Sequence, residues 1–208
     1  MRSIQSILSA PFPVAHHSNP GMDISSTFIL HITRLCANRK FKLDDEYKKG
    51  GILTEGPEFT KLDHAIIYLV NKLRNLTRTK LVKLLYLADI AHYSRTKKSL
   101  TKVTYCSYYY GPFSEKILES IEKLSPYEIE EFYRTSKDGR EYYTYTSGKN
   151  PRIMILNLTQ EEKRTLDKVI ITYGAMNLDD LLKYVYCTPQ YRKSRKGETI
   201  SITPNDRF

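Results

Sequence analysis

The 208-residue chain has no tryptophan, only three cysteines and no long apolar run. Its longest apolar run, residues 65–70, is far shorter than the roughly 20 residues of a transmembrane helix, so we expect no membrane partner. The cysteines Cys36, Cys106 and Cys187 are far apart and lack the C-x-x-C spacing of zinc sites. Free thiols are typical of a reducing compartment, and we expect a cytoplasmic protein with no metal and no other cofactor.

The chain also lacks the motifs of the common enzyme classes. It contains no G-x-S-x-G, no Gly-rich phosphate loop, no H-E-x-x-H and no dinucleotide-binding fingerprint. His64 and His92 are single histidines on expected helices, where a satisfied or surface histidine is more common than a base or a ligand. Asp179 and Asp180 stand at an expected helix start, where negative charge complements the helix dipole. We therefore expect no catalytic residues and no enzyme activity.

Positive charge is abundant and unevenly distributed. The formal net charge is +10, and residues 61–110 hold ten Lys and Arg residues against two acidic ones. A basic patch attracts nucleic acid by releasing counterions, and it attracts an acidic protein in the same way. A merely solvated lysine-rich surface is the third interpretation. The candidate patch consists of Arg95, Lys97, Lys98 and Lys102.

Apolar residues at helical spacing predict a series of short helices. They fall in residues 24–36, 60–75, 77–95, 114–124, 158–174 and 177–188. Residues 81–91 carry only two charged side chains, so this helix is expected in the centre of the domain. We expect Leu84, Leu85 and Ala88 to be buried there. Asp89 on the same helix must be partnered if it is buried, and a structural ion pair is the first expectation.

The periodicity changes after Pro126. Residues 127–147 alternate apolar and polar side chains and are interrupted at Asp138-Gly139, a two-residue hairpin signal. We expect an antiparallel hairpin here, with residues 152–158 as a third strand. The fold class that follows is α+β, mainly α: a compact helical domain with a small antiparallel β-hairpin or three-stranded sheet.

Composition divides the chain into three parts. Residues 1–59 are expected to be an N-terminal extension and linker with one possible helix, and polar residues and prolines near the start argue against a cleaved signal peptide. Residues 60–191 are expected to form the compact domain. Residues 192–208 are expected to be a basic and mobile C-terminal tail.

A tyrosine-rich turn stands between the central helix and the next one. Tyr108, Tyr109 and Tyr110 cannot all face the same way, so at least one is expected to be exposed to solvent or to a partner. Gly111 and Pro112 follow them, and Pro112 is expected in the first turn of a helix capped by Ser114, because Pro is favoured there.

Three short motifs along the chain have a recognisable order and spacing. The matching residues are Lys83, Leu84, Leu85, Tyr86, Ala88 and Asp89 of "KLLYLAD", then Tyr110, Gly111 and Pro112, then Tyr173, Gly174 and Leu181. Together they resemble the SocA-like Panacea antitoxin domain, from about Thr60 to Tyr191. The chain departs from the family pattern at Phe113, where a small aliphatic residue is usual, at Tyr186, where His is expected, and at Tyr191, which stands for Trp.

The resemblance implies a protein that binds and neutralises a cognate toxin. Such toxin-antitoxin pairs belong to bacteria, archaea or phages, and some members of the family act as adaptors that deliver the toxin to a ClpXP-type protease. Tyr108, Tyr109, Tyr110, Gly111 and Pro112 are then the expected partner-binding residues. The alternative is a winged-helix-like nucleic-acid-binding regulator, in which the basic patch contacts phosphates and a tyrosine stacks on a base.

Overall fold

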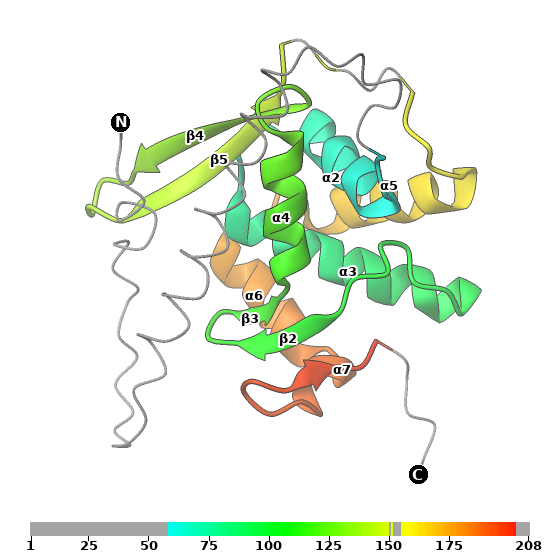
Figure 1. The fold of residues 1–208 in the computed structure, drawn as a ribbon. Helices are drawn as coiled ribbons and strands as arrows, with labels where there is room; N and C mark the ends of the chain where they lie inside the picture. Colours follow the sequence, from blue (N-terminus) through cyan, green and yellow to red (C-terminus); the bar gives the residue numbers. More distant parts are fainter. Residues whose placement is uncertain (1–57, 150, 152–154, 203–208) are drawn as a thin grey trace, which may run out of the picture. The chain divides into compact units, whose positions relative to one another are not determined.

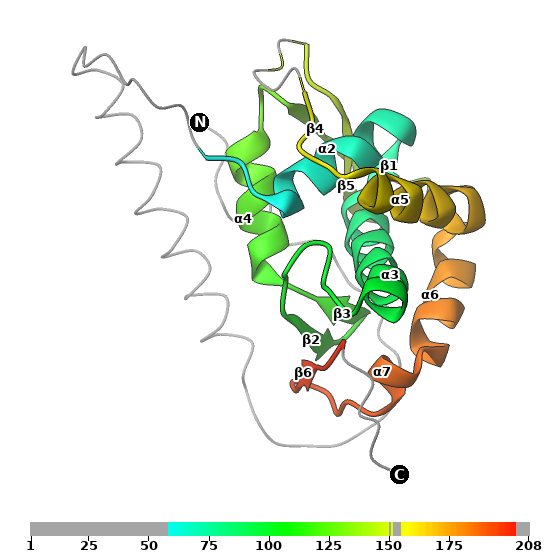
Figure 2. The ribbon, with the colours of Figure 1, turned by 90° about the vertical axis from the view of Figure 1, so that its right-hand side faces the viewer.

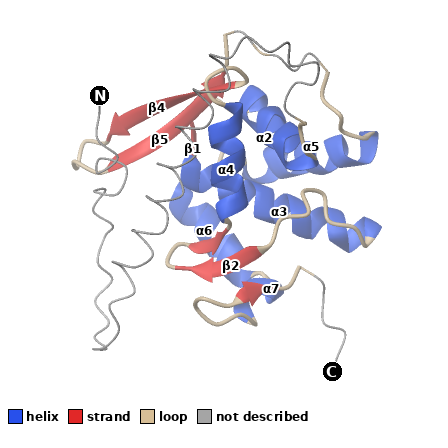
Figure 3. Ribbon diagram, in the orientation of Figure 1, coloured by secondary structure: helices blue, strands red, loops and turns tan. Residues whose placement is uncertain are grey.

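The computed structural model describes residues 58–149, 151 and 155–202. The helix expected at residues 24–36, the linker after it and Cys36 lie outside the described residues. Phe59–Arg134 and Tyr142–Phe208 group into one compact unit. The described part of the second unit is Glu58 together with Thr135–Glu141, which contain the turn expected at Asp138-Gly139. Figures 1 and 3 show a mainly helical α+β arrangement with two small sheets, as expected.

The centre of the main unit is the helix α3 (Arg78–Thr96), which the other helices surround. It packs against α2 (Lys61–Lys72), α5 (Gln160–Tyr173) and α6 (Leu178–Cys187), and α4 (Glu115–Leu124) packs on α2. In Figure 2, α5 and α6 lie along one side of α3, and both pack against it. Leu84, Leu85 and Ala88 are completely buried, which confirms the prediction of a central helix.

The helix starts follow the local capping signals. Thr60 precedes α2 and forms a capping box with the third helical residue, and Thr159 does the same with Glu162 at the start of α5. The Thr77 side chain accepts a hydrogen bond at the start of α3, and Asn177 accepts one at the start of α6. These caps satisfy backbone N–H groups that have no partner inside a helix.

The first sheet contains the expected hairpin. Its strands are β4 (Ile129–Thr135), β5 (Glu141–Ser147) and β1 (Leu76–Thr77), in the order β1-β5-β4. The third strand expected at residues 152–158 is wrong for the part that is described, because residues 155–158 form no strand and Ile155 is 86% exposed. The third position belongs to β1, where buried Leu76 pairs with buried Tyr145.

The turn between β4 and β5 forms at the expected Asp138-Gly139 signal, but it is longer than two residues. Ser136 N donates to Arg140 O at 2.8 Å, and these two residues enclose the three residues 137–139. Gly139 has φ +79°, a left-handed conformation that glycine adopts without strain.

The second sheet was not expected from the sequence. It consists of β2 (Tyr105–Tyr108), β3 (Gly111–Phe113) and β6 (Thr199–Ile200), in the order β3-β2-β6. Pro112 therefore lies in a strand, opposite Ser107, and not in a first helical turn. An edge strand such as β3 tolerates Pro, which has no N–H to donate. Ser114 does precede α4, but its side chain makes no capping hydrogen bond.

The C-terminal segment is folded as far as the structure describes it. After α7 (Pro189–Arg192) the chain turns back, and β6 pairs antiparallel with β2, Ile200 lying opposite Tyr105. Figure 2 shows β6 beside β2 at the lower end of the domain. Ile200 is 3% exposed, and burial of this side chain holds the segment in place. The expectation of a mobile tail is therefore wrong for residues 192–202. No helix in the described part of the chain is long and apolar enough to span a bilayer.

Candidate partner-binding surface

Three polar residues of the first motif lie on α3 and fix three different segments around it. They are Lys83, Tyr86 and Asp89, and their spacing of three residues places neighbouring members on adjacent turns of the helix. Lys83 is 3% exposed, and its Nζ donates to Pro112 O at 2.7 Å. Burial lowers the pKa of this ammonium group to about 7. Lys83 thus ties the central helix to the Gly-Pro motif.

Tyr86 connects α3 to the end of α6. Its hydroxyl lies 2.9 Å from Thr188 Oγ1, and its ring meets the Tyr105 ring edge-on with centroids 5.3 Å apart. Burial raises the pKa of Tyr86 to about 12, so the hydroxyl is protonated at neutral pH. This contact holds β2 and the α6–α7 junction against the same helix.

Asp89 is fully buried and organises the chain between α3 and β2. Its carboxylate accepts five hydrogen bonds, from Ser99 Oγ, Leu100 N, Thr101 N, Thr101 Oγ1 and Tyr105 Oη. Among the described residues it has no ion-pair partner, so the expected structural ion pair is wrong. The donors are hydroxyl and backbone N–H groups of the short loop after α3 and of the first residue of β2, which satisfy the negative charge without a cation.

Gly111 is required by its surroundings as well as by its backbone. It has φ +86°, and a Cβ at this position would lie 3.0 Å from Tyr186 Cε1 and 3.4 Å from Lys83 Cε. Tyr186 in turn stacks on Tyr191, with ring centroids 5.3 Å apart and planes at 30°. The two C-terminal residues that depart from the family pattern therefore pack on each other, and one of them covers the turn glycine.

The turn between β2 and β3 presents tyrosine to solvent. Tyr109 is 65% exposed and Tyr108 is 40% exposed, whereas Tyr110 is half-buried. The Tyr108 ring contacts the Phe113 ring at 5.6 Å and the Tyr109 ring at 5.0 Å. The prediction that at least one of the three tyrosines is exposed is confirmed. We call residues 108–112 the hairpin tip.

A second segment lies against the hairpin tip, and we call residues 192–198 the basic loop. The backbone N–H and C=O groups of Ser107 hold the basic loop through two hydrogen bonds: Gly197 N donates to Ser107 O at 2.7 Å, and Ser107 N donates to Glu198 O at 2.8 Å. Glu198 N also donates to Arg195 O at 3.0 Å, and Gly197 has φ +86°. The loop therefore contains a tight turn with Gly at the position that needs a positive φ.

The basic loop places a cation directly on the exposed tyrosine. Lys196 Nζ lies 3.4 Å from the centroid of the Tyr109 ring, close enough for a cation–π interaction. The sequence showed the basic run of residues 192–196, but only the pairing of β6 with β2 brings it to the hairpin tip. Together the hairpin tip and the basic loop form the hairpin–loop surface.

The basic patch expected from the sequence is arranged differently. Arg95 pairs with Glu161 at 3.2 Å and donates to Thr165 Oγ1, so its charge is used in packing α3 against α5. Lys97, Lys98 and Lys102 are exposed. Lys196 contacts the Tyr109 ring of the hairpin tip, and the candidate patch did not include this lysine.

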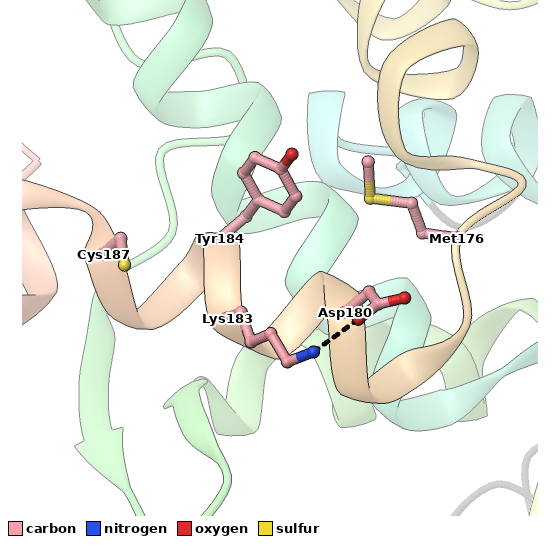
Figure 4. A pocket seen from close by; sticks show the side chains of 5 residues that line it. All are labelled: Met176, Asp180, Lys183, Tyr184 and Cys187. Atoms are coloured by element: carbon pink, nitrogen blue, oxygen red, sulfur yellow. Dashed lines mark hydrogen bonds and ion pairs between the residues drawn. The ribbon is translucent and has the colours of Figure 1, made fainter.

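The third motif supports α6, where a hollow of about 530 Å³ opens on the surface (Figure 4). Its lining residues are Met176, Asp180, Lys183, Tyr184 and Cys187. Within the motif, Leu181 is buried in the core, Gly174 O accepts from Lys80 Nζ at 2.7 Å, and the Tyr173 ring packs on the Tyr184 ring.

The hollow contains a surface ion pair and a thiol. In Figure 4, Lys183 reaches Asp180 along the helix, and the distance from Nζ to Oδ1 is 2.7 Å. Cys187 is exposed with a free thiol, and Cys106 is also free, as expected. Among the described residues, no three His, Cys, Asp or Glu side chains are grouped so that they could hold a metal ion.

The comparison with protein families agrees with these three motifs. Residues 81–190, more than half of the chain, match the family model "Antitoxin SocA-like, Panacea domain". The chain belongs to the SocA-like Panacea antitoxin family. No curated protein and no solved structure matches the chain.

The matched residues contain the scaffold of the hairpin–loop surface but not all of it. Lys83, Tyr86, Asp89 and the whole hairpin tip lie inside the Panacea match. The basic loop begins two residues after the match ends. The Panacea segment therefore includes the rigid aromatic turn, and the charged part of the surface comes from the C-terminal extension.

Proposed function

We propose that this Panacea protein is an antitoxin that binds a toxin protein in the cytoplasm and neutralises it through the hairpin–loop surface. The observation that carries the proposal is the 65% exposure of Tyr109 on a turn that the buried motif residues hold in place. Neutralisation here is by binding, without a chemical step. The family description supports the antitoxin role, and the geometry supports the location of the surface.

Rigid presentation gives a physical reason for the location. Lys83 Nζ, on α3, donates a hydrogen bond to Pro112 O, and Gly111 packs against the Tyr186 ring. Because these contacts already hold the hairpin tip in place, it loses little conformational entropy when a partner docks. Tyrosine offers apolar area and a hydroxyl, and a few such residues commonly supply most of the binding free energy at an interface. Tyr109 is the strongest candidate for such an anchor.

The test is rescue of growth in cells that express a candidate toxin, chosen as a product of the neighbouring gene that arrests growth when it is expressed alone. Tyr109→Ala should weaken rescue, while the fold remains intact in a thermal melt. Tyr142→Ala is the matched control, because Tyr142 is also an exposed tyrosine, at 38% exposure, but lies near the start of β5 in the other sheet. Equal rescue by both variants would place the docking surface elsewhere.

A finer proposal is that the chain acts as an adaptor for a ClpXP-type protease. In that case the toxin should have a short half-life when the chain is present, and a long one when the protease is removed. Simple sequestration predicts a stable toxin in both strains. A pulse-chase measurement of toxin lifetime separates the two modes.

A further inference from the structure

We propose that the basic loop selects a toxin whose docking segment is acidic, with Arg192, Arg195 and Lys196 as the residues that read its charge. The proposal deepens the proposed function, because the occupant of the surface is the toxin protein. It adds the chemistry of that occupant and assigns it to residues outside the Panacea match.

The first step of the argument is the unbalanced charge of the loop. Arg192, Arg195 and Lys196 are exposed, and none of them has a carboxylate partner among the residues that the structure describes. The one acidic side chain of the loop, Glu198, accepts a hydrogen bond from Arg195 N at 2.9 Å. Arg78 differs in this respect, since it forms an ion pair with Glu131 at 2.8 Å.

The second step is that these charges stand on a fixed backbone. Ser107 holds the loop through two backbone hydrogen bonds, and the Arg195–Glu198 turn is closed by a third. Lys196 is held further by the Tyr109 ring at 3.4 Å. A prearranged group of like charges favours a partner of opposite charge in both encounter rate and specificity.

The third step decides between a protein and a nucleic acid. A base would need a free face of the Tyr109 ring for stacking. Lys196 Nζ covers one face of this ring, and the Tyr108 ring lies against Tyr109 in a perpendicular arrangement at 5.0 Å. A protein segment needs no free ring face and can use the part of Tyr109 that stays exposed, while its carboxylates meet the loop cations. The geometry therefore favours an acidic protein segment.

The experiment measures binding by fluorescence anisotropy with the full chain and three labelled probes. The probes are a short peptide of alternating Glu and Leu, the same peptide with Gln for Glu, and a short single-stranded DNA. The acidic peptide should bind most tightly of the three, and its affinity should fall as salt rises.

The decisive variant is Arg192→Glu/Arg195→Glu/Lys196→Glu. Loss of three surface ion pairs between the loop cations and the glutamates of the peptide should weaken binding of the acidic peptide about tenfold. The matched control is Lys98→Glu/Arg164→Glu/Lys168→Glu, which makes the same change in net charge at two exposed cations of α5 and one in the loop after α3. The control should stay within about twofold of the unmodified chain.

Three outcomes would overturn the proposal: no binding of the acidic peptide, equal loss in the two triple variants, or tighter binding of the DNA probe that the loop variant abolishes. The last outcome would assign the surface to nucleic acid. The growth-rescue test remains separate. If the unmodified chain rescues growth but the acidic peptide does not bind, the antitoxin role stands and the acidic partner is rejected. If rescue fails, the toxin-binding proposal falls whatever the peptide does.

Discussion

Asp89 offers the sharpest test of how the family motif builds the surface. Its buried carboxylate accepts four hydrogen bonds from the loop that leads from α3 into β2, and a fifth from Tyr105 at the start of β2. Asp89→Ala removes all five acceptor contacts at once and leaves the donors facing an apolar cavity. Tyr105→Phe removes only one of the five, and it therefore serves as the graded comparison.

The magnitude follows from which donors remain buried. Leu100 N and Thr101 N belong to buried residues, and each orphaned N–H costs roughly 1–3 kcal/mol. The Thr101 and Tyr105 hydroxyls also lose their acceptor, but such losses are not additive, so about 3–6 kcal/mol is expected for Asp89→Ala. Tyr105→Phe should cost about 1.5–3 kcal/mol, the range for one hydrogen bond to a charged group. Asp89→Asn should fall between them, because its amide keeps one oxygen acceptor.

The assay is urea unfolding of the full chain, supported by thermal melts. At about 2–4 °C per kcal/mol for a domain of this size, a cost of about 3–6 kcal/mol should lower the Tm of Asp89→Ala by roughly 6–24 °C. Because the loop fixes β2, the same variant should also lose toxin neutralisation. An Asp89→Ala chain that is no less stable than Tyr105→Phe would refute the role of the carboxylate as the organiser of the loop.

Three further predictions concern the same core. Leu85→Ala should cost roughly 2–5 kcal/mol in urea unfolding, since Leu85 is fully buried; a cost below about 1 kcal/mol would contradict its central position. Gly111→Ala should be more destabilising than Gly139→Ala, because both have positive φ but only at Gly111 would a Cβ meet a neighbour at 3.0 Å; similar melting temperatures would reject the packing argument. Lys83 has a native pKa of about 7 against 10.5 as its ordinary value, so the native state binds fewer protons between these values and the free energy of unfolding should rise with pH across that window, by up to ~1.4 kcal/mol per unit. Lys83→Met should flatten this rise in unfolding curves recorded from pH 7 to pH 10, and an unchanged slope would show that Lys83 is not the titrating group.

Local signals in the sequence were sufficient for most helices and for the hairpin. The helices expected at residues 60–75, 77–95, 158–174 and 177–188 begin at or next to Thr60, Thr77, Thr159 and Asn177, and the side chain of each of these residues accepts a hydrogen bond at a helix start. A cap and an apolar period lie within a few residues of each other, so the sequence contains all of the information that fixes them. The same holds for the turn at Asp138-Gly139, although its length depends on the closing pair Ser136–Arg140.

The motif residues could be named from the sequence, but not their tasks. Asp89 was expected in an ion pair, yet its partners are loop N–H and hydroxyl groups, which carry no signal of their own in a sequence. Lys83 was part of the motif, but nothing in the order of residues says that its ammonium group ends at Pro112 O. Which donor meets which acceptor is decided by packing.

The sequence by itself thus determined the helical segments, the hairpin signal, the family and the exposure of a tyrosine near residue 109, because each of these depends on neighbouring residues. The tertiary structure alone decided that Pro112 lies in a strand, that β1 completes the first sheet and that β6 pairs with β2. These pairings join residues far apart in the chain, and their stability comes from burial of side chains such as Ile200. For that reason the cation on Tyr109 is Lys196, from the far end of the chain, and not a member of the basic patch that lies nearby in sequence.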